Sequence, residues 1–170
     1  QFGYNGVKGG MSGVGFVTAW VTANSGIGAK LEKGPYSAAD KATIEKSLAS
    51  LKEFNKNVVM TPGNAGTLDM LNRGEIAMGP VWVDMFYTWQ ADGKLSPKLK
   101  LSLPEPGLPG QPMYYVVPAK AANAAMARKF VEFAASPEIQ AEGIVKQFNW
   151  YPGIDPQHVK AKLDAKSWDK

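Results

Sequence analysis

The sequence predicts an α/β fold in which a mixed, mostly parallel sheet is flanked by helices. Short apolar runs of strand length alternate with longer segments of helical periodicity, a pattern typical of a sheet covered by helices on both faces. The 170 residues are 45% hydrophobic and 20% charged, which is ordinary for a globular domain with a sizeable core. We expect residues 1–170 to form one lobe.

Composition excludes several classes of function. The chain has no cysteine and one histidine, His158, so it offers no thiol nucleophile, disulfide framework, Cys/His zinc cluster or histidine-based triad. The net charge is +4, but only Arg73 and Arg128 among the 19 basic residues are arginines, and the lysines are scattered, which argues against a nucleic-acid surface. We therefore expect no enzyme, metal site or cofactor.

The first predicted helix begins in the glycine-rich stretch GGMSGVG. Ser12 is the predicted N-cap, and Phe16 and Trp20 lie on one face. Gly13 in the first turn suggests a close approach to the backbone, and the free N–H groups of a helix start suit an anion, although a flexible leading loop is an open alternative. A hydrolase nucleophile elbow is excluded because Val14 stands where that motif requires glycine.

The clearest helix begins at a capping box formed by Ser37 and Asp40. Its apolar positions recur at helical spacing, at Ile44, Leu48, Leu51 and Phe54. A short buried strand over 57–60 and a second helix, from the cap Asn64 to the stop signal Gly74, are predicted to follow.

The next strand, 75–79, is predicted to lead into an aromatic helix that starts near Trp82. Ligands of such sheets bind at the carboxyl ends of the strands, so Trp82 and Asp84 are candidate contacts, Asp84 to a cation or a hydroxyl group. Alternatively, Asp84 only complements the dipole of the helix start. Phe86 and Trp89 are predicted to pack in the core.

Two further strands are predicted around a Pro/Gly-rich connection, one over 99–103 and one over 113–117. Tyr114 and Tyr115 are neighbours on the second strand. Because successive side chains of a strand point to opposite faces, at most one of these tyrosines is expected to reach a ligand.

The C-terminal part predicts a helix with inward apolar residues, a break at Ser136 and Pro137, and a further helix. The inward residues are expected to be Met126, Phe130 and Phe133. Trp150 and Tyr151 follow in a loop, where no helix or strand face explains an aromatic pair, so ligand binding and packing are equally open. A polar helix closes the chain, anchored by Val159, Leu163 and Trp168.

Three stretches carry a resemblance to a known family. They are the glycine-rich start GGMSGVGFV, the strand and cleft segment LNRGEIAMGPVW, and the strand and helix pair VVPAKAANAAMARKFVEFAASPEIQ, followed by YPGI. Together they resemble the C-terminal half of a bacterial extracellular solute-binding protein of an ABC importer, over about residues 9–155.

The resemblance implies the C-terminal lobe of a two-lobe periplasmic binding protein of type II, which closes on its ligand by a hinge. The sequence begins at Gln1, without an initiator methionine or a leader pattern. We therefore expect the chain to be a piece that lacks the N-terminal lobe and the export signal. The implied partners are a small-molecule solute, permease subunits and the missing lobe, and an isolated lobe could dimerise. The implied location is the periplasm, or the cell exterior with a lipid anchor.

Carried over residue by residue, the resemblance implies a mixed pocket of aromatic, carboxylate and backbone N–H groups, which suits a sugar, a thiamine-like cation or a polyamine. Its predicted residues are Ser12, Gly13, Trp82, Asp84, Tyr114, Tyr115, Trp150 and Tyr151.

Two other functional classes share this two-lobe fold. One comprises enzymes such as pyrimidine-precursor synthases and porphobilinogen deaminase, which need a reactive cysteine, a histidine or a dense set of acids and arginines. The other is the effector-sensing lobe pair of transcription regulators, which the Ser-Pro-Glu helix pair fits poorly. The residue inventory argues against the enzymes, and the helix pair together with the long Pro/Gly connection argues against the regulator, so we favour the transport receptor.

Overall fold

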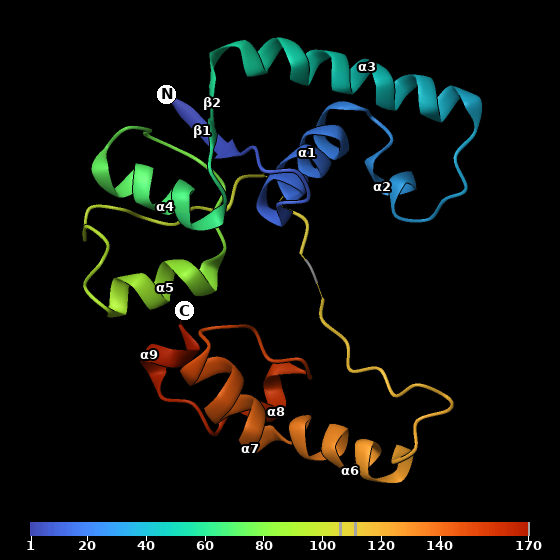
Figure 1. Cartoon of the computed structure of the whole chain (residues 1–170), viewed down its shortest axis with the longest axis vertical. Helices are drawn as coiled ribbons and strands as arrows, with labels where there is room; N and C mark the ends of the chain where they lie inside the picture. Colours follow the sequence, from blue (N-terminus) through green and yellow to red (C-terminus); the bar gives the residue numbers. More distant parts are fainter. Residues whose placement is uncertain (106, 111, 170) are drawn as a thin grey trace. The chain divides into compact units, whose positions relative to one another are not determined.

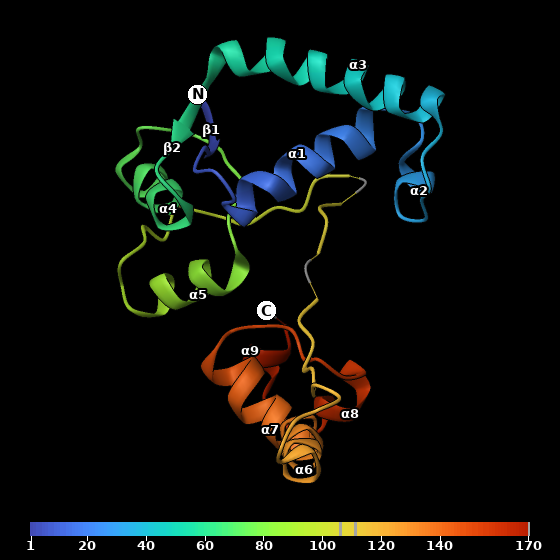
Figure 2. The ribbon, with the colours of Figure 1, turned by 45° about the vertical axis from the view of Figure 1, so that its right-hand side comes forward.

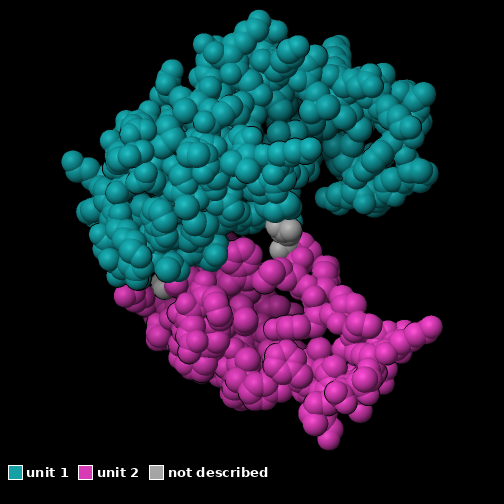
Figure 3. All heavy atoms as spheres, viewed as in Figure 1, with its two compact units in different colours: residues 1–110 teal, residues 111–170 magenta. Residues whose placement is uncertain are grey.

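The computed structural model describes residues 1–105, 107–110 and 112–169. The chain divides into two compact units, residues 1–110 and 111–170 (Figure 3). The prediction of a single lobe over residues 1–170 remains a prediction.

Unit 1 contains both strands of the described sheet and most of the long helices (Figure 1). Its elements are β1 (Phe2–Asn5), α1 (Met11–Asn24), α2 (Gly28–Leu31), α3 (Ala38–Phe54), the 3-10 helix η1 (Asn55–Asn57), β2 (Val58–Thr61), α4 (Asn64–Arg73) and α5 (Val83–Ala91). Unit 2 is helical in its described part. Its elements are α6 (Ala124–Ala134), α7 (Pro137–Ile139), the π-helix η2 (Gln140–Gln147), α8 (Pro156–Lys160) and α9 (Ala165–Trp168).

The sheet is small and parallel. β1 pairs with β2 in a register that places Phe2 opposite Val58, and Phe2 also forms a parallel bridge with Met78 on its other side. The Gly3 amide donates to the Met78 carbonyl oxygen at 2.9 Å. The predicted α/β class with a parallel sheet is therefore confirmed, although β1 itself was not predicted.

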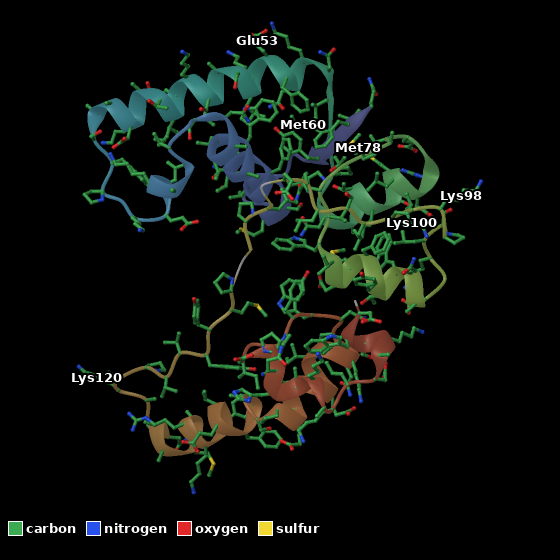
Figure 4. All side chains as sticks on the ribbon, turned by 180° about the vertical axis from the view of Figure 1, so that it is seen from behind. Glu53, Met60, Met78, Lys98, Lys100 and Lys120 are labelled. Atoms are coloured by element: carbon green, nitrogen blue, oxygen red, sulfur yellow. The ribbon has the colours of Figure 1, made fainter. Side chains whose placement is uncertain are left out.

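The predicted strand over 75–79 is reduced to the single bridge at Met78. Ile76 is buried, as a residue of a covered strand would be, but the side chain of Met78 is 64% exposed. Among the described residues no further strand continues the sheet beyond Met78, so this position lies at an edge. Figure 4 labels Met78 and the half-exposed Met60 of β2.

An aromatic cluster covers one face of the sheet. The ring centroids of Tyr4 and Phe16 are 4.6 Å apart, and those of Trp20 and Phe54 are 4.8 Å apart, so β1, α1 and α3 share this contact. The Trp20 indole N–H also donates to the Ser47 carbonyl oxygen at 3.2 Å. The predicted packing of Phe16 and Trp20 on one helix face agrees with these contacts, each worth about 0.5–1.5 kcal/mol beyond area burial.

Helices α4 and α5 form a second apolar cluster in unit 1. Leu68, Phe86 and Leu95 are its buried members, and Trp89 packs against them half-buried. The prediction that Phe86 and Trp89 belong to the core is confirmed.

The predicted helix starts and stops are partly correct. The capping box of Ser37 and Asp40 is present at the start of α3, and α4 stops at Gly74, whose φ of 75° is left-handed. Ser12 is not the cap of α1, because the helix begins at Met11 and Gly10 stands at the cap position.

The predicted cap Asn64 is likewise wrong. It is the first residue of α4, which begins after Gly63. Gly63 has a φ of 99°, a conformation that favours glycine and sets the chain direction into the helix.

The strands predicted over 99–103 and 113–117 do not form. Both segments run outside the sheet, and Leu103 and Met113 are 73% and 80% exposed. Strand propensity records how well a side chain packs on neighbouring strands, and the described part of the chain supplies neither segment with such a neighbour. The argument that Tyr114 and Tyr115 point to opposite faces of a strand therefore no longer applies.

Four apolar residues are buried in the described part of unit 2. They are Ala134, Ala141, Val145 and Val159. Pro137 starts α7 as predicted, with the Ser136 hydroxyl oxygen as its cap, and the predicted anchor Val159 is fully buried. The predicted closing helix is two short helices, α8 and α9.

The inward face predicted for α6 is wrong. Met126, Phe130 and Phe133 are 67%, 57% and 59% exposed, whereas the buried residue of this helix is Ala134, in its last turn. Phe130 still meets the edge of the Tyr115 ring, with centroids 6.0 Å apart. In the described ranges, no helix is both long and apolar enough to cross a membrane.

Candidate functional site

The parallel pairing brings several helix starts to one edge of unit 1. β1 ends at Asn5 and is followed by α1, while β2 ends at Thr61 and is followed by α4. The segment through Met78 runs parallel to β1 and is followed by α5 (Figure 2). The carboxyl ends of parallel strands meet at the same edge of a sheet, where ligands of open α/β sheets bind.

A polar cluster joins two of these helix starts. Asn64 Oδ1 accepts hydrogen bonds from the Ser12 hydroxyl at 2.6 Å and from Asn5 Nδ2 at 2.8 Å. Asn5 Oδ1 in turn accepts from the Val7 amide at 3.0 Å. Asn5 and Ser12 are buried, with 4% and 7% of their surface exposed. The cluster therefore fixes the starts of α1 and α4 relative to the end of β1.

The starts of α1 and α4 are electropositive. In the described structure neither helix has a side-chain cap, and neither has an acidic residue in its first turn. The partial positive charge of the helix dipole is therefore not offset locally, which favours an acceptor or an anionic group nearby.

Gly13 is required by the chain's own backbone. A Cβ atom on Gly13 would lie 2.1 Å from the carbonyl oxygen of Asn5, far inside van der Waals contact. The close approach expected at this glycine is thus made by the end of β1. A ligand contact by Gly13 remains a prediction.

The position of Asp84 agrees with the helix-dipole interpretation and leaves the ligand interpretation a prediction. Asp84 lies in the first turn of α5, where a carboxylate complements the helix dipole. Its Oδ1 is also buried and has no hydrogen-bond partner in the described part of the chain. A buried acceptor without a donor costs about 1–3 kcal/mol. A ligand contact by Asp84 remains a prediction.

Trp82 is the residue immediately before α5. Its backbone is extended, with φ −80° and ψ 133°, and its side chain is half-buried. Trp82 and Asp84 are therefore held together at the junction between the sheet edge and α5.

The aromatic candidates in unit 2 lie in two segments. Tyr114 and Tyr115 are 80% and 57% exposed, on the extended stretch before α6. Trp150 is half-buried and Tyr151 is 65% exposed, in the loop between η2 and α8. Asn149 begins this loop in the left-handed conformation, with φ 52°.

Sequence reasoning missed Asn5 and Asn64 as parts of the site. Both are asparagines directly at or beyond the end of a short strand, a position at which polar side chains reach the ligand edge of an α/β sheet. Within the described ranges, His, Asp and Glu residues form no group of three or more that could hold a metal ion.

Comparison with known proteins gives one match. No curated protein and no solved structure matches the chain. The family model of bacterial extracellular solute-binding proteins matches residues 4–155, which is most of the chain and close to residues 9–155 of the resemblance. The chain therefore belongs to the bacterial extracellular solute-binding proteins, a generally non-enzymatic family that binds substrates for ABC-type import in the periplasm or outside the cell.

Proposed function

We propose that this chain is a C-terminal lobe that contributes half of the solute site of an ABC importer's receptor. The proposal extends the family's general role in substrate binding to specific residues. The observation that carries it is Asp84 Oδ1, a buried carboxylate oxygen without a partner among the described residues. It lies at the start of α5, which follows the carboxyl edge of the sheet.

The ligand chemistry follows from the charges at this edge. Asp84 accepts a hydrogen bond from a hydroxyl or a cationic nitrogen, and such charge-assisted bonds are worth about 1.5–3 kcal/mol. The starts of α1 and α4 favour an acceptor or anionic group on the same solute. A small polar solute with donors and acceptors, such as a sugar or a thiamine-like or polyamine cation, fits this combination.

Aromatic side chains supply the remaining contacts in the proposal. Trp82 adjoins Asp84, and stacking of a sugar or a cation on an indole ring contributes about 0.5–2 kcal/mol. In unit 2 we propose contacts from Trp150 and Tyr151 in their loop and from Tyr114 or Tyr115. Ser12 and Gly13 are proposed to contribute through the amides of the α1 start.

The exposed apolar residues of unit 2 support the proposal that another protein surface covers them. Met113, Tyr114, Val116, Phe130 and Phe133 are each more than half exposed, and monomeric proteins seldom leave such a group of large apolar residues in water. We propose that an N-terminal lobe covers this surface in the intact receptor, and that a second copy covers it in the chain of residues 1–170 alone. Permease subunits and a lipid anchor belong to the same proposal.

The test uses the full-length receptor, purified under native conditions. Native mass spectrometry of the protein should reveal a bound small molecule that is released on denaturation. The same protein should show a thermal shift with at least one of maltotriose, thiamine, spermidine and inorganic phosphate. A protein that releases no small molecule and shifts with none of these four contradicts the proposal.

A further inference from the structure

The loop that carries Trp150 and Tyr151 is held by a buried glutamine of the π-helix η2. Gln140 is only 4% exposed, although its side chain is polar. Burying an amide there costs free energy unless both its ends are paired. An apolar residue of the same size would fill the space without this cost, so the amide needs an explanation beyond packing.

Both ends of the Gln140 amide are used, and they reach different segments. Nε2 donates to the carbonyl oxygen of Ala134 at 2.7 Å, in the last turn of α6. Oε1 accepts from the amide of Gly153 at 2.6 Å, at the far end of the aromatic loop. The assignment of the two ends is unambiguous, because a carbonyl oxygen needs a donor and a backbone N–H needs an acceptor.

The loop is therefore fixed at two points. The Trp150 amide donates to the Ile144 carbonyl oxygen at 3.1 Å, and Gly153 is held by Gln140 three residues later. Tyr151 lies between these anchors with an exposed side chain. Gln140 stands at the first position of η2, and π-helical turns occur frequently at functional sites.

We propose that Gln140 is a positioning residue that sets the conformation in which Trp150 and Tyr151 meet the solute. The inference rests on the proposed function, because it takes these two aromatic residues as solute contacts. A ligand-facing loop needs a defined shape, since a loop that must be ordered on binding weakens affinity. The bidentate amide supplies this order before the solute arrives.

The test compares Gln140→Met, which keeps the length of the side chain but can neither donate nor accept strongly, with two other variants. Gln140→Glu keeps the acceptor for Gly153 but places an oxygen against the Ala134 carbonyl. Gln147→Met is the matched control, because Gln147 ends the same helix with an exposed side chain. Amide hydrogen exchange in the chain of residues 1–170 and solute affinity in the full-length receptor, with the four-solute panel, are the two readouts.

We expect Gln140→Met to accelerate exchange at the Gly153 amide about tenfold, as for the loss of one buried hydrogen bond, and to leave exchange at Leu51 of α3 unchanged. Affinity for the bound panel solute should fall at least about fivefold at a temperature where the variant is fully folded. Gln140→Glu should restore slow exchange at Gly153 in part, and Gln147→Met should change neither readout.

Two results overturn the inference. Unchanged exchange at Gly153 shows that Gln140 does not hold the loop, and accelerated exchange with unchanged affinity shows that the loop does not position solute contacts. A wild-type receptor that binds none of the four solutes counts against the proposed function and removes the ligand role of Gln140. Hydrogen exchange at Gly153 still decides separately whether Gln140 holds the loop.

Discussion

The hydroxyl of Ser12 donates a hydrogen bond to Asn64 Oδ1 at 2.6 Å, which ties the start of α1 to the start of α4 at the end of the sheet. Asn64→Ala removes the acceptor of both Ser12 and the buried Asn5. The free energy of unfolding should fall by about 2 kcal/mol or more, because stranded buried donors cost about 1–3 kcal/mol each. Urea denaturation measures this change.

Ser12→Ala removes only one of the two donors, so its cost should be about 1 kcal/mol. Ser102→Ala is the control, because Ser102 is exposed and should change stability by less than about 0.5 kcal/mol. Equal urea midpoints for the wild type, Ser12→Ala and Asn64→Ala would show that the polar cluster does not hold the two helices.

Two glycines of α1 give a matched pair. Gly13→Ala places a Cβ atom 2.1 Å from the backbone oxygen of Asn5 and should destabilise the chain by about 1–3 kcal/mol through overpacking. A Cβ on Gly15 meets nothing within 4 Å, so Gly15→Ala should stabilise the helix by about 0.5–1 kcal/mol. Thermal unfolding of both variants checks the opposite signs, and a Gly13→Ala variant as stable as Gly15→Ala refutes the packing argument.

Asp40 makes stability depend on pH at the acid end. The Lys30 ammonium, 2.6 Å away, and then the hydroxyl and amide of Ser37 lower the pKa of the Asp40 carboxyl from 3.8 to about 2. Because the folded pKa is depressed, the stabilisation is present above the unfolded pKa and is lost as the pH falls from about 4 towards about 2.

Asp40→Asn removes this contribution. The difference in urea midpoint between the wild type and Asp40→Asn should be largest at about pH 5 and should shrink as the pH approaches about 2. Asp92→Asn, at the exposed end of α5, is the control for general loss of a carboxylate. A wild-type advantage that stays constant over this range is incompatible with the depressed pKa.

The apolar face of α6 should make the isolated chain self-associate. The exposed rings of Phe130 and Phe133 lie one turn apart on this helix, and covering them removes apolar surface from water at about 25 cal/mol per Å². Light scattering coupled to gel filtration should show a mass that rises with concentration, and the double variant Phe130→Ser, Phe133→Ser should reduce it.

Phe148→Ser provides the comparison, because Phe148 is 66% exposed but lies outside α6. Phe148→Ser should leave the increase of the measured mass with protein concentration unchanged. A wild-type chain that stays monomeric at all concentrations, or equal self-association in all three proteins, argues against this surface as an interface.

The sequence predicted those parts of the fold that local signals determine. The capping box at Ser37, the stop at Gly74 and the proline start at Pro137 are local chemistry, and the structure contains all three. The strand over 113–117 and the inward face of α6 depended on neighbours elsewhere, and propensity alone cannot supply a pairing partner.

The candidate site was predictable in part for the same reason. The position of Asp84 after a predicted strand was enough to make it a candidate site residue. Only the structure shows that its Oδ1 is buried without a hydrogen-bond partner among the described residues. Asn5 was missed because β1 is only four residues long and lies at the start of the chain. Gly13 has no room for a Cβ atom because the carbonyl oxygen of Asn5, in that unpredicted strand, lies against it. The sequence therefore indicated a close approach but not the group that makes it.

The most direct test of the account is isothermal titration calorimetry of the full-length receptor and its Asp84→Asn variant with maltotriose, thiamine, spermidine and inorganic phosphate. Asp92→Asn is the matched control, because Asp92 caps the other end of α5 and pairs with Lys94 at the surface. We predict that at least one solute binds and that Asp84→Asn weakens it about tenfold or more, as the loss of a charge-assisted hydrogen bond requires, while Asp92→Asn stays within about twofold. Binding that is equally tight in the wild type and Asp84→Asn, or no binding of any of the four, would contradict the account.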